Sequence, residues 1–130
     1  MKLQENVVKL LKEQVWYLAT YSDEPNAVPV AFKDVTEDDR LVVGDVFLDT
    51  TLRNIAANGR IAVSASNAAS PEGYQIKGTA AYITAGPVVD TFQQMVEARF
   101  HGAVTAKGAL VITPERVIVT TPGADNKKEL

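Results

Sequence analysis

The sequence predicts a mainly β fold, an antiparallel barrel with a few short helices attached, for three reasons. Six segments carry the aromatic and β-branched residues, and much of the alternating apolar pattern, that are typical of strands. Turn residues join several consecutive strands, so the βαβ alternation of a parallel sheet is missing. Finally, 130 residues without a repeat or a linker are the length of one domain, which we expect to span 1–130.

The first half of the chain predicts a helix, a three-strand meander and a second helix. The first helix is amphipathic and ends near Gln14, since its apolar residues recur at helical spacing: Leu3, Val7, Leu10 and Leu11. Polar turn segments separate the three expected strands, which cover residues 15–21, 27–32 and 40–45. Asp49 or Thr50 caps the second helix, and Asn58 with Gly59 ends it.

The second half predicts three more strands and one more helix. The strands are expected over residues 60–66, 74–84 and 109–121. Pro87 suits the first turn of the helix, whose apolar face repeats at helical spacing. Pro114 interrupts the last strand and must lie at an edge, a turn or a bulge. Residues 123–130 are expected to form a flexible tail.

Composition excludes several classes of function. The net charge of −3 provides no positive field for nucleic acid or anionic lipid, and the absence of cysteine removes disulfides, thiolate nucleophiles and most zinc sites. No long apolar run predicts a signal peptide or a membrane span, so we expect a cytoplasmic protein. The single histidine, His101, follows a helix and is interpreted as a residue near the helix C-terminus rather than a metal ligand or a base.

The start of the second helix has the chemistry of a phosphate site. Residues 49–54 place two threonine hydroxyls, free backbone N–H groups and Arg53 around a first helical turn, where the helix dipole also favours anions. The alternative is an ordinary N-cap, in which Thr50 or Thr51 bonds only its own backbone. Local spacing alone leaves both interpretations open.

Two longer motifs separate these interpretations. Residues 25–30 read Pro-Asn-Ala-Val-Pro-Val, and residues 50–61 read Thr-Thr-Leu-Arg-Asn-Ile-Ala-Ala-Asn-Gly-Arg-Ile. In this order and spacing they resemble the core of the pyridoxamine 5′-phosphate oxidase-like flavin-binding proteins. Within that superfamily, residues 73–82 and 109–113 are most similar to the short bacterial FMN-binding proteins.

The resemblance implies a six-stranded antiparallel split β-barrel with Greek-key order, forming a homodimer with FMN between the subunits. It places the flavin ring along the second strand and the phosphate at the second helix. One departure is the threonine at position 50, where the family often has lysine, which leaves Arg53 or a partner-subunit residue to supply positive charge. The implied cofactor-binding residues are Pro29, Val30, Ala31, Phe32, Thr50, Thr51, Arg53 and Asn54.

The function that follows is a small FMN-binding flavoprotein that transfers electrons or acts as a flavin-dependent oxidoreductase. The alternative is a non-catalytic flavin carrier, or an interaction module that has lost its ligand. No catalytic residue, metal site, substrate or redox partner is assigned, and no set of basic residues indicates a site for pyridoxamine phosphate. Large aromatic residues on the strands are interpreted as core or interface residues rather than flavin contacts: Trp16, Tyr17, Tyr74 and Tyr82.

Overall fold

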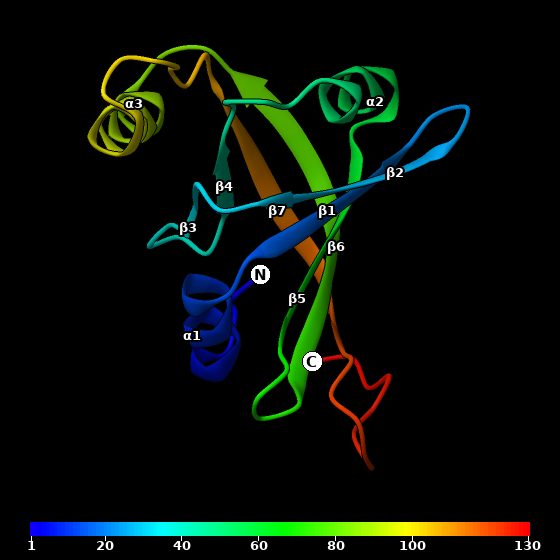
Figure 1. Cartoon of the computed structure of the whole chain (residues 1–130). Helices are drawn as coiled ribbons and strands as arrows, with labels where there is room; N and C mark the ends of the chain where they lie inside the picture. Colours follow the sequence, from blue (N-terminus) through cyan, green and yellow to red (C-terminus); the bar gives the residue numbers. More distant parts are fainter.

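The computed structural model describes all residues from Met1 to Leu130 and contains three helices and seven strands (Figure 1). The helices are α1 (Glu5–Glu13), α2 (Thr50–Asn58) and α3 (Pro87–Phe100). The strands are β1 (Trp16–Tyr21), β2 (Pro25–Val30), β3 (Lys33–Val35), β4 (Leu41–Gly44), β5 (Arg60–Asn67), β6 (Glu72–Ile83) and β7 (Ala109–Val119). No helix is both long enough and apolar enough to cross a membrane.

The sheet curls into a split barrel because of how its two edges are connected. All strand pairs are antiparallel, in the order β2-β1-β5-β6-β7-β4-β3. β2 and β3 are therefore the two ends of the order, although only residues 31–32 separate them in the chain. Since so short a link spans at most roughly 11 Å, the two edges must lie near each other. The split-barrel class predicted from the sequence fits this arrangement.

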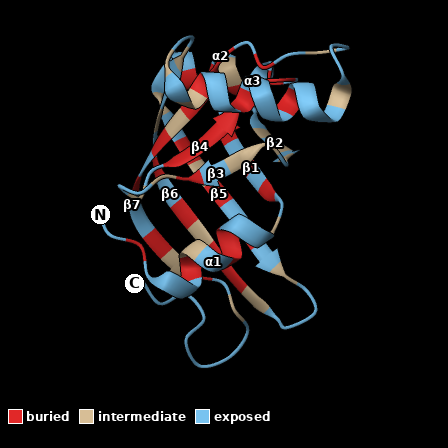
Figure 2. Ribbon diagram, turned by 90° about the vertical axis from the view of Figure 1, so that its left-hand side faces the viewer, coloured by how far each residue is buried: buried red, intermediate tan, exposed pale blue.

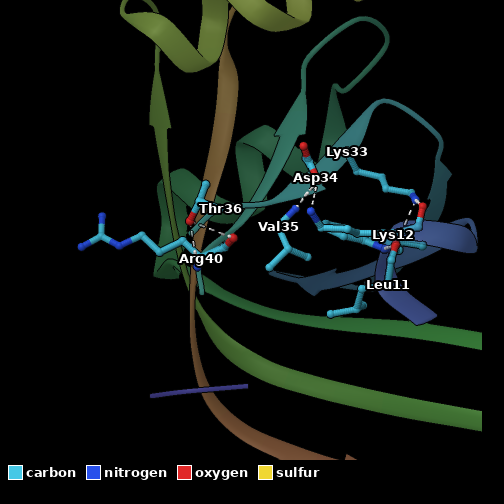
Figure 3. Close-up of polar contacts among 8 residues, drawn as sticks. Leu11, Lys12, Lys33, Asp34, Val35, Thr36 and Arg40 are labelled. Carbon is cyan, nitrogen blue, oxygen red and sulfur yellow. Dashed lines mark hydrogen bonds and ion pairs between the residues drawn. The ribbon is translucent and has the colours of Figure 1, made fainter. Parts of the chain in front are cut away.

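The prediction of six strands was wrong by one, because β3 had been assigned to a polar connection. Lys33 on β3 points toward α1 (Figure 3), and its ammonium group donates to the carbonyls of Leu11 and Lys12, both at 2.9 Å. These are among the last carbonyls of α1, which have no partner within the helix. Partial burial lowers the pKa of Lys33, an effect that the nearby carboxylate of Asp34 opposes. Three residues are too few to show an alternating pattern, so this strand is defined by its antiparallel pairing with β4, in which Lys33 lies opposite Val43.

Two separate cores hold the barrel together. The larger core lies inside the curl of the sheet and joins apolar residues of α1 to strand residues such as Trp16, Leu18 and Ile76. The smaller core joins α3 to β4 and the start of β7, with Phe92 at its centre. Both views place α1 at one end of the barrel and α2 and α3 at the other, and buried and exposed residues alternate along the strands (Figure 2). The cavity described below lies at the end that carries α2.

The end of the chain and the bulge in the long strands follow from specific contacts. The ladder between β6 and β7 shifts register between Lys77 and Gly78, where Gly78 faces Pro114. Pro114 therefore lies at a bulge, as the sequence required. A side chain at Gly78 would place its Cβ 2.1 Å from the carbonyl oxygen of Thr113, so only glycine fits. Residues 123–130, expected as a tail, turn back along β7 through backbone hydrogen bonds.

Candidate functional site

A cavity opens at the split of the barrel, beside the free edge of β2. Its volume is about 480 Å³, within the range of pockets that hold small organic ligands. Thirteen residues line it: Asn26 and residues 28–32 from β2 and the following link, Gly44 from the end of β4, residues 46–49 from the loop after β4, and Thr50 and Thr51 from α2. The cavity thus joins three segments that are separate in the sequence.

One wall of the cavity is the edge strand β2. This strand pairs only with β1, so alternate backbone N–H and C=O groups along its other edge have no strand partner. The side chains that it contributes, including Val28, Pro29 and Val30, are apolar. This wall therefore combines an apolar surface with backbone groups that can hydrogen-bond a flat, polar-edged ligand.

Another part of the cavity lining is the first turn of α2. The N–H of Arg53 is the first to bond back along the helix, to the carbonyl of Asp49 at 3.1 Å. The N–H groups of Thr50, Thr51 and Leu52 precede it and have no intrahelical acceptor. Asp49 occupies the N-cap position, but its side chain makes no capping hydrogen bond. The helix therefore starts with free donors, and its dipole adds partial positive charge there.

A buried network of polar side chains fixes this turn against β1 and β2. Nδ2 of Asn26 donates to the hydroxyl of Thr51 at 3.1 Å, and Nδ2 of Asn54 donates to the hydroxyl of Thr20 at 3.1 Å. Thr20, Thr51 and Asn54 are each at least nine-tenths buried. Since the Thr51 oxygen accepts from Asn26, the hydroxyl hydrogen of Thr51 remains free to donate to another acceptor.

Arg53 is held by its neighbours on the exposed side of the same turn. Its Nη1 lies 2.6 Å from Oδ1 of Asp49, and its Nη2 donates to the hydroxyl of Thr50 at 3.0 Å. The side chains of Asp49 and Arg53 are 80% and 66% exposed, so water screens this ion pair. Arg53 is therefore near the cavity but already engaged with a carboxylate.

The structure brings most of the sequence-predicted site residues together. Six line the cavity: Pro29, Val30, Ala31, Phe32, Thr50 and Thr51. Arg53 and Asn54 do not line it, because Arg53 turns to Asp49 and the amide of Asn54 points into the network with Thr20. Sequence analysis did not assign Asn26 or residues 46–48 to the site. Only their positions in the sequence could have indicated a role. Asn26 lies near the start of β2, and residues 46–48 immediately precede the N-cap Asp49 of α2.

Asp45, the first residue of the loop between β4 and α2, anchors this loop to β6. This residue is 1% exposed, and its carboxyl group accepts from the hydroxyl of Tyr82 at 2.5 Å and from the N–H of Leu48 at 3.1 Å. Burial, assisted by Asp45, raises the pKa of Tyr82 to about 12. The Tyr82 hydroxyl is therefore a proton donor across the neutral range and holds the loop from β6.

Comparison with known proteins identifies the family. Residues 3–123, nearly the whole chain, match the sequence profile of the pyridoxamine 5′-phosphate oxidase family. The chain belongs to that family. The resemblance inferred from the motifs at residues 25–30 and 50–61 is thereby confirmed.

Three proteins illustrate how far this chain is similar to known sequences and structures. An uncharacterised protein of Methanocaldococcus jannaschii is 29% identical over 132 residues, which cover 98% of this chain and 87% of the relative. The crystal structure of HupZ from Group A Streptococcus gives a TM-score of 0.82 at 23% identity, covering 95% of this chain and 98% of HupZ. An FMN-binding protein of Syntrophomonas wolfei gives 0.72 at 15% identity, covering 84% and 78%. These structural likenesses concern the fold.

Of the four large aromatic residues on the strands, two lie in the core and two lie at the surface. Trp16 and Tyr74 are buried, whereas Tyr17 and Tyr82 are 54% and 37% exposed. None of the four lines the cavity. Two phenylalanines, Phe32 and Phe47, line the cavity instead, and Phe47 is 76% exposed.

Removing the Tyr82 hydroxyl is expected to destabilise the protein. Tyr82→Phe leaves the buried carboxyl group of Asp45 with the Leu48 N–H alone, and hydrogen bonds to such groups contribute about 1.5–3 kcal/mol. Urea unfolding should report a loss in that range. Tyr17→Phe, which changes an exposed tyrosine of β1, is the matched control and should change stability by less than about 0.5 kcal/mol. Equal effects of the two substitutions would contradict a role for Tyr82 in anchoring the loop.

Proposed function

We propose that this chain binds FMN in the cavity at the barrel split and works as a small redox flavoprotein. The observation that supports this most directly is the cavity itself. It brings the free backbone edge of β2 together with the free N–H groups and hydroxyls that start α2. A flavin mononucleotide has a flat ring with polar edges and a phosphate at the end of a short chain, and the two walls correspond to these two parts.

The ring would lie against β2 and the following link. The side chains of Pro29, Val30 and Ala31 provide an apolar surface, and the strand's unpaired N–H and C=O groups suit the polar edge of the ring. Phe32 and the loop that carries Phe47 would limit water around it. When bound, FMN supplies the one- or two-electron chemistry. The chain's own part is to orient the ring and restrict its contact with water.

The phosphate would lie at the first turn of α2. Thr50 offers an exposed hydroxyl, and Thr51 offers a hydroxyl hydrogen that Asn26 leaves free to donate. The N–H groups of the same turn and the helix dipole favour an anion at this place. This arrangement needs no lysine at position 50, where the family often has one.

The spectrum of the purified protein tests both parts of the proposal. A yellow protein, or one that turns yellow on addition of FMN, is expected to show an absorption band near 450 nm. Bleaching of this band by NADH or NADPH and its return in air supports an oxidoreductase, and bleaching by dithionite alone favours a carrier or electron-transfer protein. A protein that stays colourless and binds neither FMN nor riboflavin overturns the proposal and leaves a ligand-free interaction module.

We also expect a homodimer that completes the cavity. The cavity is open at the barrel split, and the exposed side chain of Phe47 at its mouth is a large apolar surface for an isolated subunit to leave in water. A second copy would cover it and add the missing wall, as two-fold interfaces do. Sedimentation equilibrium should give twice the monomer mass of 14.0 kDa. A monomer that binds FMN tightly at every concentration would contradict the shared site.

A further inference from the structure

No charged side chain at the cavity adds to the attraction that the first turn of α2 offers a phosphate. Among the thirteen residues that line it, Asp49 is the only one with a charged side chain, and that charge is negative. The nearest cation, Arg53, lies outside the lining and is paired with the same carboxylate at 2.6 Å. The two side-chain charges offset each other, so the positive charge that a phosphate meets at this turn comes from the helix N-terminus and not from a side chain.

The position of Asp49 makes this cancellation effective. Its carboxylate stands at the N-cap of α2 yet caps no backbone N–H, and it turns instead to the guanidinium group of Arg53. The second nitrogen of Arg53 donates to Thr50, the residue with the exposed hydroxyl in the cavity. Asp49 therefore engages the cation nearest to the cavity, whereas the Thr50 hydroxyl, which accepts from Arg53, keeps its hydrogen free to donate.

We propose that Asp49 determines how strongly this cavity distinguishes phosphorylated from unphosphorylated flavins. This inference rests on the proposed binding of FMN. A phosphate dianion that binds Arg53 competes with the carboxylate already paired with it, and it then lies close to that like charge. Riboflavin shares the ring but lacks the phosphate. It therefore neither competes for Arg53 nor is repelled by Asp49. Asp49 thus lowers the advantage of FMN over riboflavin.

Asp49→Asn tests the inference directly. The substitution keeps the size of the side chain, removes the negative charge and releases Arg53 toward the cavity. FMN affinity, measured by quenching of flavin fluorescence, is expected to rise about tenfold at low salt, whereas riboflavin affinity should stay within about twofold. The gain should shrink as sodium chloride is added, because the new contribution is a screened charge interaction.

Two further variants separate the mechanism from a general change in charge. Asp125→Asn removes one negative charge from an exposed ion pair in the C-terminal turn, far along the chain from the cavity, and should leave both affinities unchanged. Adding Arg53→Gln to Asp49→Asn should abolish most of the gain in FMN affinity, because the released guanidinium group is its source.

The outcomes distinguish this inference from the proposal on which it rests. If the wild type binds both flavins and Asp49→Asn leaves their affinity ratio unchanged, the role of Asp49 is overturned while FMN binding stands. If Asp125→Asn raises FMN affinity as much as Asp49→Asn does, overall charge is responsible and the inference is wrong. If neither the wild type nor Asp49→Asn binds either flavin, both the inference and the proposed function fail.

Discussion

Replacing Thr51 with alanine is expected to weaken FMN binding by about ten- to a hundredfold and to leave riboflavin binding nearly unchanged. Thr51 lies in the first turn of α2, lines the cavity and keeps a hydroxyl hydrogen free because its oxygen accepts from Asn26. A hydrogen bond to a charged group contributes roughly 1.5–3 kcal/mol, which corresponds to this loss. Parallel titrations with the two flavins measure the difference.

The control for this prediction must separate the phosphate contact from local structure. Thr51→Ser retains the hydroxyl and should keep most of the FMN affinity. Thr51→Ala also removes the acceptor of Asn26, so thermal unfolding of each variant should be measured alongside binding. Equal weakening of FMN and riboflavin by Thr51→Ala would show that this turn does not hold the phosphate.

The largest loss of stability is expected for Trp16→Ala. The indole ring is fully buried in the larger core, its Nε1 donates to the carbonyl of Leu11 at 2.7 Å, and the ammonium of Lys33 lies 5.6 Å from its centroid. Truncating a large buried aromatic residue costs about 3–5 kcal/mol. Since domains of this size are stable by only about 5–15 kcal/mol, the variant should be close to unfolding.

Urea unfolding followed by circular dichroism is the suitable measurement, because Trp16 is the only tryptophan and the variant has no indole fluorescence. Val15→Ala, at the exposed preceding position, should cost less than about 1 kcal/mol. A loss below about 1 kcal/mol for Trp16→Ala would mean that the indole does not link α1 to the barrel.

Local pattern was sufficient to predict much of the fold. The three helices and six of the seven strands lie within a few residues of their predicted positions, because each is long enough for its apolar period to appear. Gly59 ends α2 with a positive φ of 72°, as its place after Asn58 indicated. β3 was missed because three residues are too few to show an alternating pattern, and its pairing with β4 exists only in the folded chain.

The site was predicted in part for a similar reason. The family motifs indicated that β2 and α2 contribute to the site, and residues of both elements do line one cavity. What a motif does not contain is the direction of each side chain. Arg53 turns to Asp49 rather than to the cavity, and Asn54 turns into the core because Thr20 offers it a buried acceptor. Both choices depend on neighbours that only the folded chain supplies.

The division of the barrel into two cores has a consequence for how the molecule opens. α3 packs through the smaller core alone, so it can detach as a cooperative unit at a lower free energy than global unfolding requires. The loop at the cavity belongs to both units, since Val46 is part of the smaller core and Leu48 part of the larger. Occupation of the cavity would therefore hold the loop that both cores share, and the backbone amides of α3 would exchange with solvent more slowly although α3 does not line the cavity.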